Sequence, residues 1–213
     1  MIRFLKDTLF SLYLLISSII FSVLITLNIS PLLYSFFLNF KGLPAISNLS
    51  KNQIMNDYTN IIHYLNSPYE TTLKFENFKM SPTGEYHFLE VKNIFTSVYL
   101  AALTYLILGI ILFILLKKFK LKIYLKAFNL FFYEVLIICS LILLGFYFNF
   151  SKVFTLFHKV FFNNDYWIFD PKKDPIINVL PESYFLFLAT VVILLVLLFS
   201  IVSKVFYSLK KSL

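Results

Sequence analysis

The chain has 213 residues, of which 59% are hydrophobic and only 14% are charged, and its net charge is +8. Soluble domains average about 25% charged residues, so this composition excludes an ordinary soluble protein with one water-facing core. The basic residues flank long apolar runs, which is typical of membrane topology and argues against a nucleic-acid partner. Cys139 is the only cysteine, so no intramolecular disulfide can form.

Four apolar runs are long enough to cross a membrane as helices, which takes roughly 20 residues each. They cover about residues 8–30, 93–116, 127–151 and 183–205. Pro31 is expected to end the first run, which is too long for the apolar core of a signal peptide. The sequence therefore predicts an all-α membrane protein, a single membrane domain over the whole chain with four transmembrane helices.

The distribution of charge predicts how the four helices are oriented. The N-terminal stub, the loop 117–126 and the C-terminal tail together carry ten basic residues and one acid, Asp7. The loops 31–92 and 152–182 instead balance nine basic residues with nine acids. By the positive-inside rule, both termini are cytoplasmic and the two larger loops lie outside the membrane.

The first outer loop, residues 31–92, is long enough to form an extracellular cap. Its apolar start, residues 31–40, is too short to span and is expected to lie along the membrane interface, with Tyr34 and Phe36 as belt residues.

The rest of this loop predicts one short helix. Ser50 and Gln53 fit a capping box, and apolar residues at helical spacing follow over residues 51–66. Residues 72–78 alternate weakly, which would allow a strand or a small strand pair. Residues 81–84, Ser-Pro-Thr-Gly, have the composition of a turn.

The second outer loop concentrates polar and aromatic residues beside lipid. Its stretch 157–182 holds the only tryptophan, Trp167, together with four acids, three prolines and His158. Ionisable groups next to a membrane are costly to keep, so this density favours a functional site over a simple connector.

Two histidines mark the predicted site. His87 precedes the second span by about as many residues as His158 follows the third, so continued helices would place each roughly 7–10 Å outside the spans. A single such histidine would more simply be an interfacial aromatic, but two at matched depth favour function. His63 lies within the predicted cap helix, where a packed or surface role is expected.

Other chemistries have weaker sequence support. His87, Glu90, His158 and Asp165 include enough ligand types for zinc, but no HExxH or CxxC pattern accompanies them, so no metal or other cofactor is predicted. The chain has no G-x-S-x-G motif. Glu134, inside the third run, would either mark a proton path or form a hydrogen bond between helices.

Two motifs resemble those of the lipoprotein intramolecular transacylases, small four-helix membrane proteins of Gram-positive bacteria. YHFLEVKNIF, residues 86–95, resembles their His-x-x-Asp-Val-Lys signature, with Glu90 in place of the aspartate. FHKVFFNNDYWIFDPKKDPIINVLPESYF, residues 157–185, resembles the second signature: Phe-His, an Asn/Asp-x-x-Trp block, Asp-Pro and a proline before the last span. In length and topology the resemblance covers the whole chain.

The resemblance implies an enzyme that moves the sn-2 acyl chain of a diacylglyceryl-modified lipoprotein to the amine of its own N-terminal cysteine, giving a lyso-form lipoprotein. The family histidines that match His87 and His158 are regarded as the catalytic pair. The implied partners are the diacylated lipoprotein N-terminus and the bacterial cytoplasmic membrane, with the active site at the outer face. The oligomeric state is left open, with a monomer expected.

Ester aminolysis needs a free amine and a proton for the departing glyceryl oxygen, and two histidines serve both needs near neutral pH. Glu90 and Asp165 are expected to orient the imidazoles, while Lys92, Asn163 and Asn164 are candidate donors to the oxyanion. The expected walls of the substrate pocket are Phe161, Phe162, Tyr166 and Trp167. Interfacial packing or loop capping is the alternative role for each of these side chains.

Two other functions remain open at this point. The first is a membrane protein without catalytic activity that binds a lipid or lipoprotein under its cap. The second is a zinc-dependent membrane hydrolase.

Overall fold

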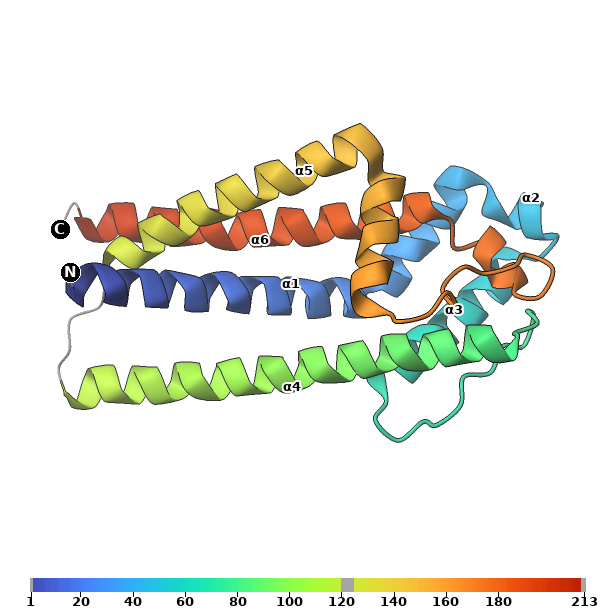
Figure 1. Cartoon of the computed structure of the whole chain (residues 1–213), viewed down its shortest axis with the longest axis horizontal. Coiled ribbons are helices and arrows are strands. Elements are labelled where there is room, and N and C mark those ends of the chain that lie inside the picture. Colours follow the sequence, from blue (N-terminus) through green and yellow to red (C-terminus); the bar gives the residue numbers. More distant parts are fainter. Residues whose placement is uncertain (1, 120–124, 212–213) are drawn as a thin grey trace. The chain divides into compact units, whose positions relative to one another are not determined.

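The computed structural model describes residues 2–119 and 125–211. Within these ranges the chain is helical and contains no strand, which confirms the predicted all-α class. The elements, shown in Figure 1, are α1 (Ile2–Lys41), α2 (Leu43–Ser47), α3 (Lys51–Asn66), α4 (Pro82–Lys118), α5 (Leu125–Phe161), the 3₁₀ helix η1 (Pro175–Asn178) and α6 (Glu182–Lys211).

Four of these helices, α1, α4, α5 and α6, are long and apolar enough to cross a membrane. Only 6% of the most apolar window of α4 is buried inside the protein, so its side chains mostly face outward. An apolar helix with so little protein around it is suited to lipid, where helices satisfy their own backbone polar groups. The prediction of a multi-pass membrane protein with four spanning helices is confirmed.

Contacts divide the chain into two compact units, and each long helix contributes a segment to both. The first unit comprises Met1–Leu24, Tyr99–Phe148 and Thr190–Leu213. The second comprises Ile25–Val98 and Asn149–Ala189, and it therefore contains both outer loops and both predicted catalytic histidines.

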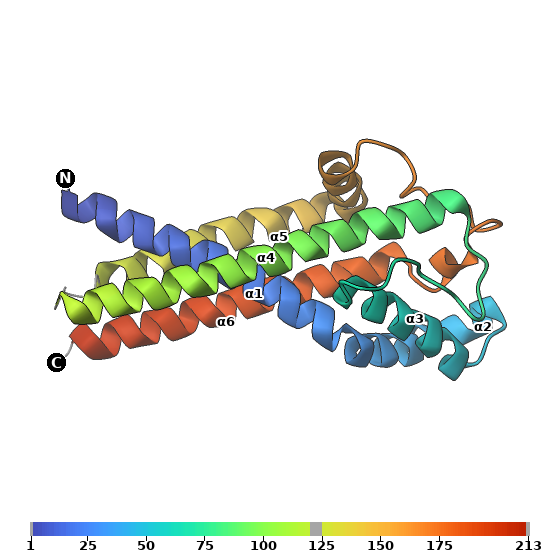
Figure 2. The same ribbon diagram turned by 90° about the horizontal axis from the view of Figure 1, so that it is seen from below.

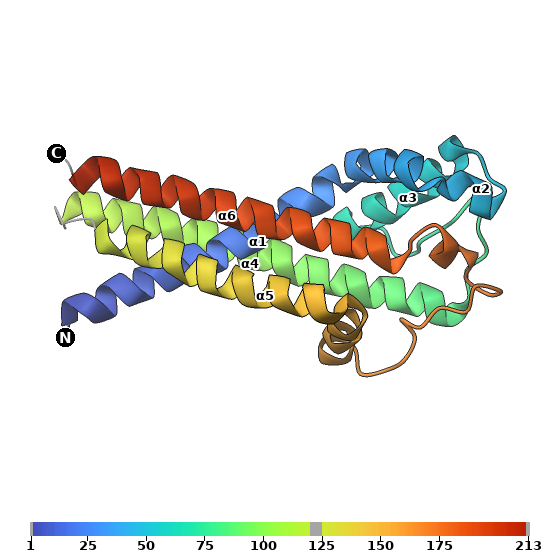
Figure 3. The same ribbon diagram turned by 90° about the horizontal axis from the view of Figure 1, so that it is seen from above.

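The first unit is a bundle of four helical segments, which run alongside one another in Figures 2 and 3. Its core is formed by Leu15, Phe131, Val135, Cys139, Ile193 and Val196. Ser11 donates a hydrogen bond to Oε1 of Glu134 at 2.9 Å, so Glu134 forms the bond between helices that was one of its two predicted roles.

The basic segments of the first unit gather at one end. The first turn of α1, the last turn of α4, the first turn of α5 and the last turn of α6 lie together there (Figure 1). Two lysines of the predicted basic loop, Lys120 and Lys122, are outside the described residues. This arrangement is the one that the positive-inside rule requires of chain segments on a single side of a membrane.

Helix α1 continues through Pro31, so the prediction that the helix ends there is wrong. A proline inside a helix leaves the carbonyl four residues earlier without its usual amide donor, and here that carbonyl belongs to Leu27. The hydroxyl of Ser30 donates to the Leu27 carbonyl at 2.7 Å and replaces the missing bond.

The interfacial role expected of Tyr34 is also wrong, because its side chain is fully buried. Its ring stacks on Tyr58 with centroids 4.0 Å apart, and its hydroxyl donates to the Val179 carbonyl at 2.7 Å. Tyr58 and Tyr184 share a further hydroxyl bond of 2.8 Å. This tyrosine cluster joins α1, α3 and α6 within the second unit. Phe36, by contrast, is exposed, and its role as a belt residue stays a prediction.

The cap helix α3 has the predicted bounds and the predicted capping box. Ser50 accepts from the amide of Gln53, and the Gln53 side chain accepts from the amide of Ser50. The strand considered for residues 72–78 is not formed. The buried carboxylate of Asp57 accepts from the amides of Glu76 and Asn77 at 2.7 and 2.9 Å.

The Ser-Pro-Thr-Gly segment is the start of α4 and not a free turn. Ser81 acts as N-cap, since its hydroxyl accepts from the Gly84 amide at 3.0 Å, and Pro82 takes the first helical position that proline prefers. The buried carboxylate of Asp174 accepts from both the amide and the hydroxyl of Ser81 at 2.7 Å. The outer loop thereby fixes the end of the helix that carries His87.

Helix α5 is interrupted at Asn149, whose backbone leaves the helical region. The Asn149 side chain accepts from the Lys152 amide at 2.9 Å, so it caps a new helical segment. This second segment runs to Phe161 and carries His158 within the second unit.

Candidate active site

The structure brings the two predicted catalytic histidines together in the second unit. His87 lies on α4 and His158 on the last segment of α5, and their ring centroids are 6.0 Å apart. Each residue is only 8% exposed, so the imidazoles meet largely out of water. Two helix ends that are distant in sequence thus supply one site.

Aromatic rings surround both imidazoles. His87 meets the edge of Phe162 at 4.7 Å and of Phe169 at 5.6 Å between centroids. His158 is stacked on Trp167 at 4.5 Å and contacts Phe154 at 4.3 Å. Phe162 and Trp167 were predicted pocket residues, whereas Phe154 and Phe169 were missed because no motif singles out one phenylalanine among 27.

The tautomer of His158 follows from its backbone contact. Its Nδ1 lies 2.7 Å from the carbonyl oxygen of Phe154, one helical turn earlier. A carbonyl oxygen only accepts hydrogen bonds, so the neutral ring carries its proton on Nδ1. The lone pair on Nε2 is then available to accept a proton from a substrate.

The other imidazole faces a carboxylate without bonding it. Nδ1 of His87 lies 3.8 Å from Oε2 of Glu90, and within the described part of the chain neither atom has a hydrogen-bond partner although both are buried. The second oxygen of Glu90 accepts from the side chain of Asn164 at 2.8 Å, which fixes the carboxylate. A buried acid and a buried imidazole are therefore both free to meet a polar group of a ligand.

Burial keeps both imidazoles neutral at physiological pH. Both lie outside the apolar runs 93–116 and 127–151 that are predicted to span the membrane. Burial, with a smaller contribution from the nearby His158, lowers the pKa of His87 from 6.5 to about 4. Burial also lowers the pKa of His158, against the opposing effects of the Phe154 carbonyl and of Glu182. The pair is thus in the proton-accepting form that base catalysis requires.

Three other predicted residues are placed away from the imidazoles. Lys92 is five positions beyond His87, which turns its side chain roughly 140° around the helix. Its ammonium donates to the Glu70 carbonyl and lies 4.2 Å above the ring of Tyr64. Asn163 and Asp165 are exposed, and in the described residues Asp165 forms no hydrogen bond or ion pair with either histidine.

A hollow of about 740 Å³ opens beside Glu90. It is lined by Pro82, Thr83, Tyr86, Glu90, Phe161, Asn163, Asn164 and Tyr166. The predicted wall residues Phe161 and Tyr166 line it, and Tyr166 meets Tyr86 edge-to-face at 5.6 Å. Neither histidine lines this hollow, but Glu90, which does, has its Oε2 3.8 Å from Nδ1 of His87.

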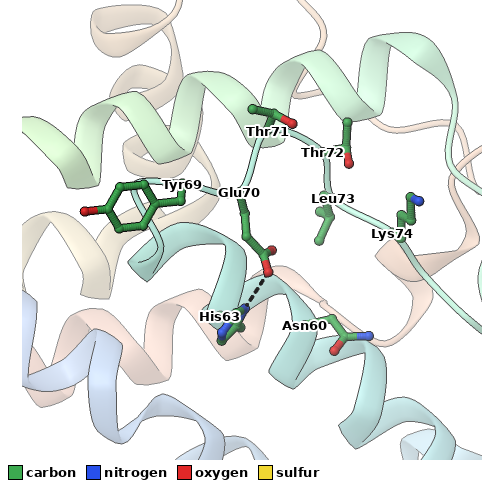
Figure 4. A pocket seen from close by; sticks show the side chains of 8 residues that line it. All are labelled: Asn60, His63, Tyr69, Glu70, Thr71, Thr72, Leu73 and Lys74. Atoms are coloured by element: carbon green, nitrogen blue, oxygen red, sulfur yellow. Dashed lines mark ion pairs between the residues drawn. The ribbon is translucent and has the colours of Figure 1, made fainter.

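A second hollow, of about 460 Å³, lies between α3 and the segment that follows it (Figure 4). Its lining is Asn60, His63, Tyr69, Glu70, Thr71, Thr72, Leu73 and Lys74. His63 forms an ion pair of 3.1 Å with Glu70, and both side chains are well exposed, as the predicted surface role of His63 requires. This hollow shares no lining residue with the first.

The residues considered for zinc do not form a metal site. Among the residues described, no three of the histidine, cysteine, aspartate and glutamate side chains lie close enough to hold one ion. Asp165, a member of the proposed set, is on the surface.

Known proteins share both the sequence and the fold. The profile of the family described as lipoprotein intramolecular transacylase Lit matches residues 8–185. The in meso structure of the membrane integral lipoprotein intramolecular transacylase Lit from Bacillus cereus has a TM-score of 0.83 and 32% identity over 97% of each chain. A search of curated proteins found no match.

Two variants of the Bacillus cereus enzyme, each with one histidine replaced, are similar as well. The histidine-to-arginine variant has a TM-score of 0.75 and 33% identity, covering 97% of this chain and 93% of that one. The histidine-to-alanine variant has a TM-score of 0.74 and 33% identity, with coverages of 97% and 95%. With family profile and fold in agreement along nearly its whole length, this chain belongs to the lipoprotein intramolecular transacylase family.

Proposed function

We propose that this protein moves the sn-2 acyl chain of a diacylglyceryl lipoprotein onto the α-amine of the same molecule's N-terminal cysteine, using His87 and His158 as general acid and base. The observation that carries the proposal is the buried pair of imidazoles, 6.0 Å apart between centroids and neutral at physiological pH. The assignment of the chain to the family supports the same reaction.

The proposed reaction balances without a co-reactant. The amine nitrogen forms a bond to the ester carbonyl carbon, and Nε2 of His158 accepts the proton that the nitrogen loses. The bond from carbon to the glyceryl oxygen then breaks, and that oxygen receives a proton through His87. The products are an amide and a free glyceryl hydroxyl in one molecule, so no proton or water is consumed overall.

The lowered pKa values bear on both roles. A neutral His158 has a free lone pair for the proton of the amine at physiological pH, and a protonated His87 is a stronger acid than an ordinary imidazolium because its pKa is about 4. Such an acid can donate to a glyceryl oxygen, which is a poor leaving group without a proton. The close spacing of the rings allows the proton that His158 accepts in the first step to reach His87, which donates it in the second.

The remaining contribution of the protein is to hold the amine against the ester. Good orientation of two groups within one molecule is worth about 7–11 kcal/mol of the barrier, which explains how the reaction proceeds without a serine or cysteine nucleophile. Glu90, fixed by Asn164 beside His87, is proposed as a positioning residue for the imidazole or for the incoming amine.

The membrane setting completes the proposal. The spans cover about residues 8–30, 93–116, 127–151 and 183–205, with residues 31–92 as the cap and 152–182 as the second outer loop. Both termini are cytoplasmic, and the histidine pair works at the outer face of the bacterial cytoplasmic membrane on the diacylated lipoprotein N-terminus. We propose a monomer that needs no cofactor.

The test is turnover by the purified protein in lipid vesicles with a synthetic peptide that begins with diacylglyceryl cysteine. Mass spectrometry of the native protein's product should find N-acylated, S-monoacylglyceryl cysteine. His87→Ala and His158→Ala should each abolish most of this conversion while the variants remain folded. Equal conversion by these variants and the native protein would rule out the two-histidine mechanism.

A further inference from the structure

Trp167 has a buried hydrogen-bond donor that nothing in the described chain uses. Its residue is half-buried, but the indole Nε1 has essentially no contact with solvent and no acceptor within reach among the described residues. Leaving a buried donor unpaired costs about 1–3 kcal/mol, so such groups usually serve a ligand or a strained function.

The position of this donor relates it to the proposed base. The indole ring lies stacked on the imidazole of His158, with centroids 4.5 Å apart and planes 29° from parallel. An oxygen that accepted a hydrogen bond from Nε1 would lie about 3 Å from it, at the edge of the same stacked pair. The unused donor is therefore carried by a ring that is in direct contact with the imidazole of the proposed base.

The donors expected from the sequence are either engaged in other hydrogen bonds or exposed. The amide of Asn164 donates to Glu90 at 2.8 Å. The ammonium of Lys92 donates to the Glu70 carbonyl. Asn163 is on the surface. Among the described residues near the histidine pair, two buried nitrogens have no hydrogen-bond partner, Nδ1 of His87 and Nε1 of Trp167. The imidazole of His87 is already assigned to proton transfer, so the indole N–H is the buried donor that the proposed reaction has not yet used.

We propose that Nε1–H of Trp167 is the oxyanion donor of the acyl transfer. This inference rests on the proposed function. When the amine nitrogen bonds to the ester carbonyl carbon, the carbonyl oxygen takes up the displaced electron pair and becomes the oxyanion. The indole N–H stabilises that charge until the glyceryl oxygen leaves with its proton and the carbonyl reforms. Trp167 is thus a catalytic residue as well as a wall of the pocket.

The chain allows a sharp test because it contains one tryptophan. Growth on an analogue in which sulfur replaces the indole N–H changes Trp167 and no other residue, and it keeps the size and stacking of the ring. We expect kcat on the diacylglyceryl cysteine peptide to fall roughly 100-fold, within the range found for loss of an oxyanion donor, with KM changed less than about twofold. Fluorinated tryptophans, which retain a more acidic N–H, should keep kcat near the native value.

The possible outcomes separate the inference from the function. If the sulfur analogue turns over at the native rate while His87→Ala is inactive, the donor role is wrong and the transacylase function stands. A rise in KM with kcat unchanged would also overturn the donor role, since it would mean that the ring only binds. If the native protein converts no peptide, the function fails and the inference fails with it. Trp167→Phe checks the result without an analogue, and Tyr69→Phe, a highly exposed ring, is its control.

Discussion

The second unit contains two histidine–glutamate pairs of the same chemistry in different surroundings. His63 and Glu70 are exposed, and their atoms are 3.1 Å apart, as in an ordinary surface ion pair. His87 and Glu90 are largely buried, their nearest atoms are 3.8 Å apart, and both atoms lack partners among the described residues. The residue types alone would identify both pairs as candidate sites. The pair at the candidate active site is distinguished by its burial and by its atoms without hydrogen-bond partners.

The largest difference between the pairs should be in catalysis. His87→Ala should lower kcat by about 10²–10⁴-fold, the usual contribution of a general acid or base. His63→Ala, the matched variant of the exposed pair, should leave kcat unchanged. Turnover of the diacylglyceryl cysteine peptide in vesicles measures both, and a loss of activity in the His63 variant would erase the proposed distinction.

Replacing Glu90 should lower activity more than replacing Glu70, but by a smaller factor than replacing His87. Glu90→Gln removes the charge beside His87, and we expect activity to fall roughly 10- to 100-fold because a misplaced reacting group carries a cost of that order. Glu90→Asp keeps the charge and should retain most activity. Glu70→Gln is the control and should behave like the native protein; similar losses in Glu90→Gln and Glu70→Gln would contradict the account.

A change at the start of α4 should disturb the buried pair and spare the exposed one. A side-chain carbon added at Gly84 would lie 2.4 Å from Oδ1 of Asp174, which is too close for any real contact. Gly84→Ala should therefore lower the free energy of unfolding by about 1–3 kcal/mol and reduce turnover by moving His87. Thr72→Ala, at an exposed position of the other hollow, is the control, and unfolding in detergent together with turnover measures both variants.

Acidification should destabilise the fold through the buried histidine. The pKa of His87 is 6.5 without burial and about 4 in the folded protein, so between these values the unfolded chain binds more protons. Stability should therefore be unaffected by this group above pH 6.5, fall as pH drops toward about 4, and change no further below it. His87→Asn should flatten this part of the stability curve; equal curves for His87→Asn and the native protein would contradict the burial effect.

The smallest effect should come from breaking the exposed ion pair. Surface pairs are worth at most about 1 kcal/mol, so Glu70→Gln should change the free energy of unfolding by less than this amount. A larger loss would mean that the segment anchored to α3 by this pair contributes more to stability than its exposure indicates. Chemical unfolding of Glu70→Gln and the native protein at low and high salt measures this difference in the free energy of unfolding.

The sequence predicted those features that are encoded locally or by strong patterns. The four apolar runs indicated the spanning helices, and the capping box of Ser50 and Gln53 indicated the start of α3. The matched positions of His87 and His158 outside the spans indicated that the two residues would meet. The first two predictions depend on local patterns, whereas the meeting of the histidines also used the order of the four spans along the chain.

The missed features depend on side-chain contacts that no sequence pattern marks. Where α1 continues through Pro31, the Ser30 hydroxyl bonds the Leu27 carbonyl, and the buried Tyr34 bonds the Val179 carbonyl, far along the chain. The unpaired indole of Trp167 is visible only once every neighbouring acceptor has been placed. Residue type and spacing carry no information of this kind.

The most direct test of the central claim is an isotope crossover experiment with the purified protein. Two diacylglyceryl cysteine peptides, one with heavy acyl chains and one with a heavy peptide, are mixed in vesicles and analysed by tandem mass spectrometry. We predict that each peptide keeps its total mass while one of its own acyl chains moves from glycerol to the amine. Loss of an acyl chain as free fatty acid, or exchange of labels between the peptides, would contradict an intramolecular transfer.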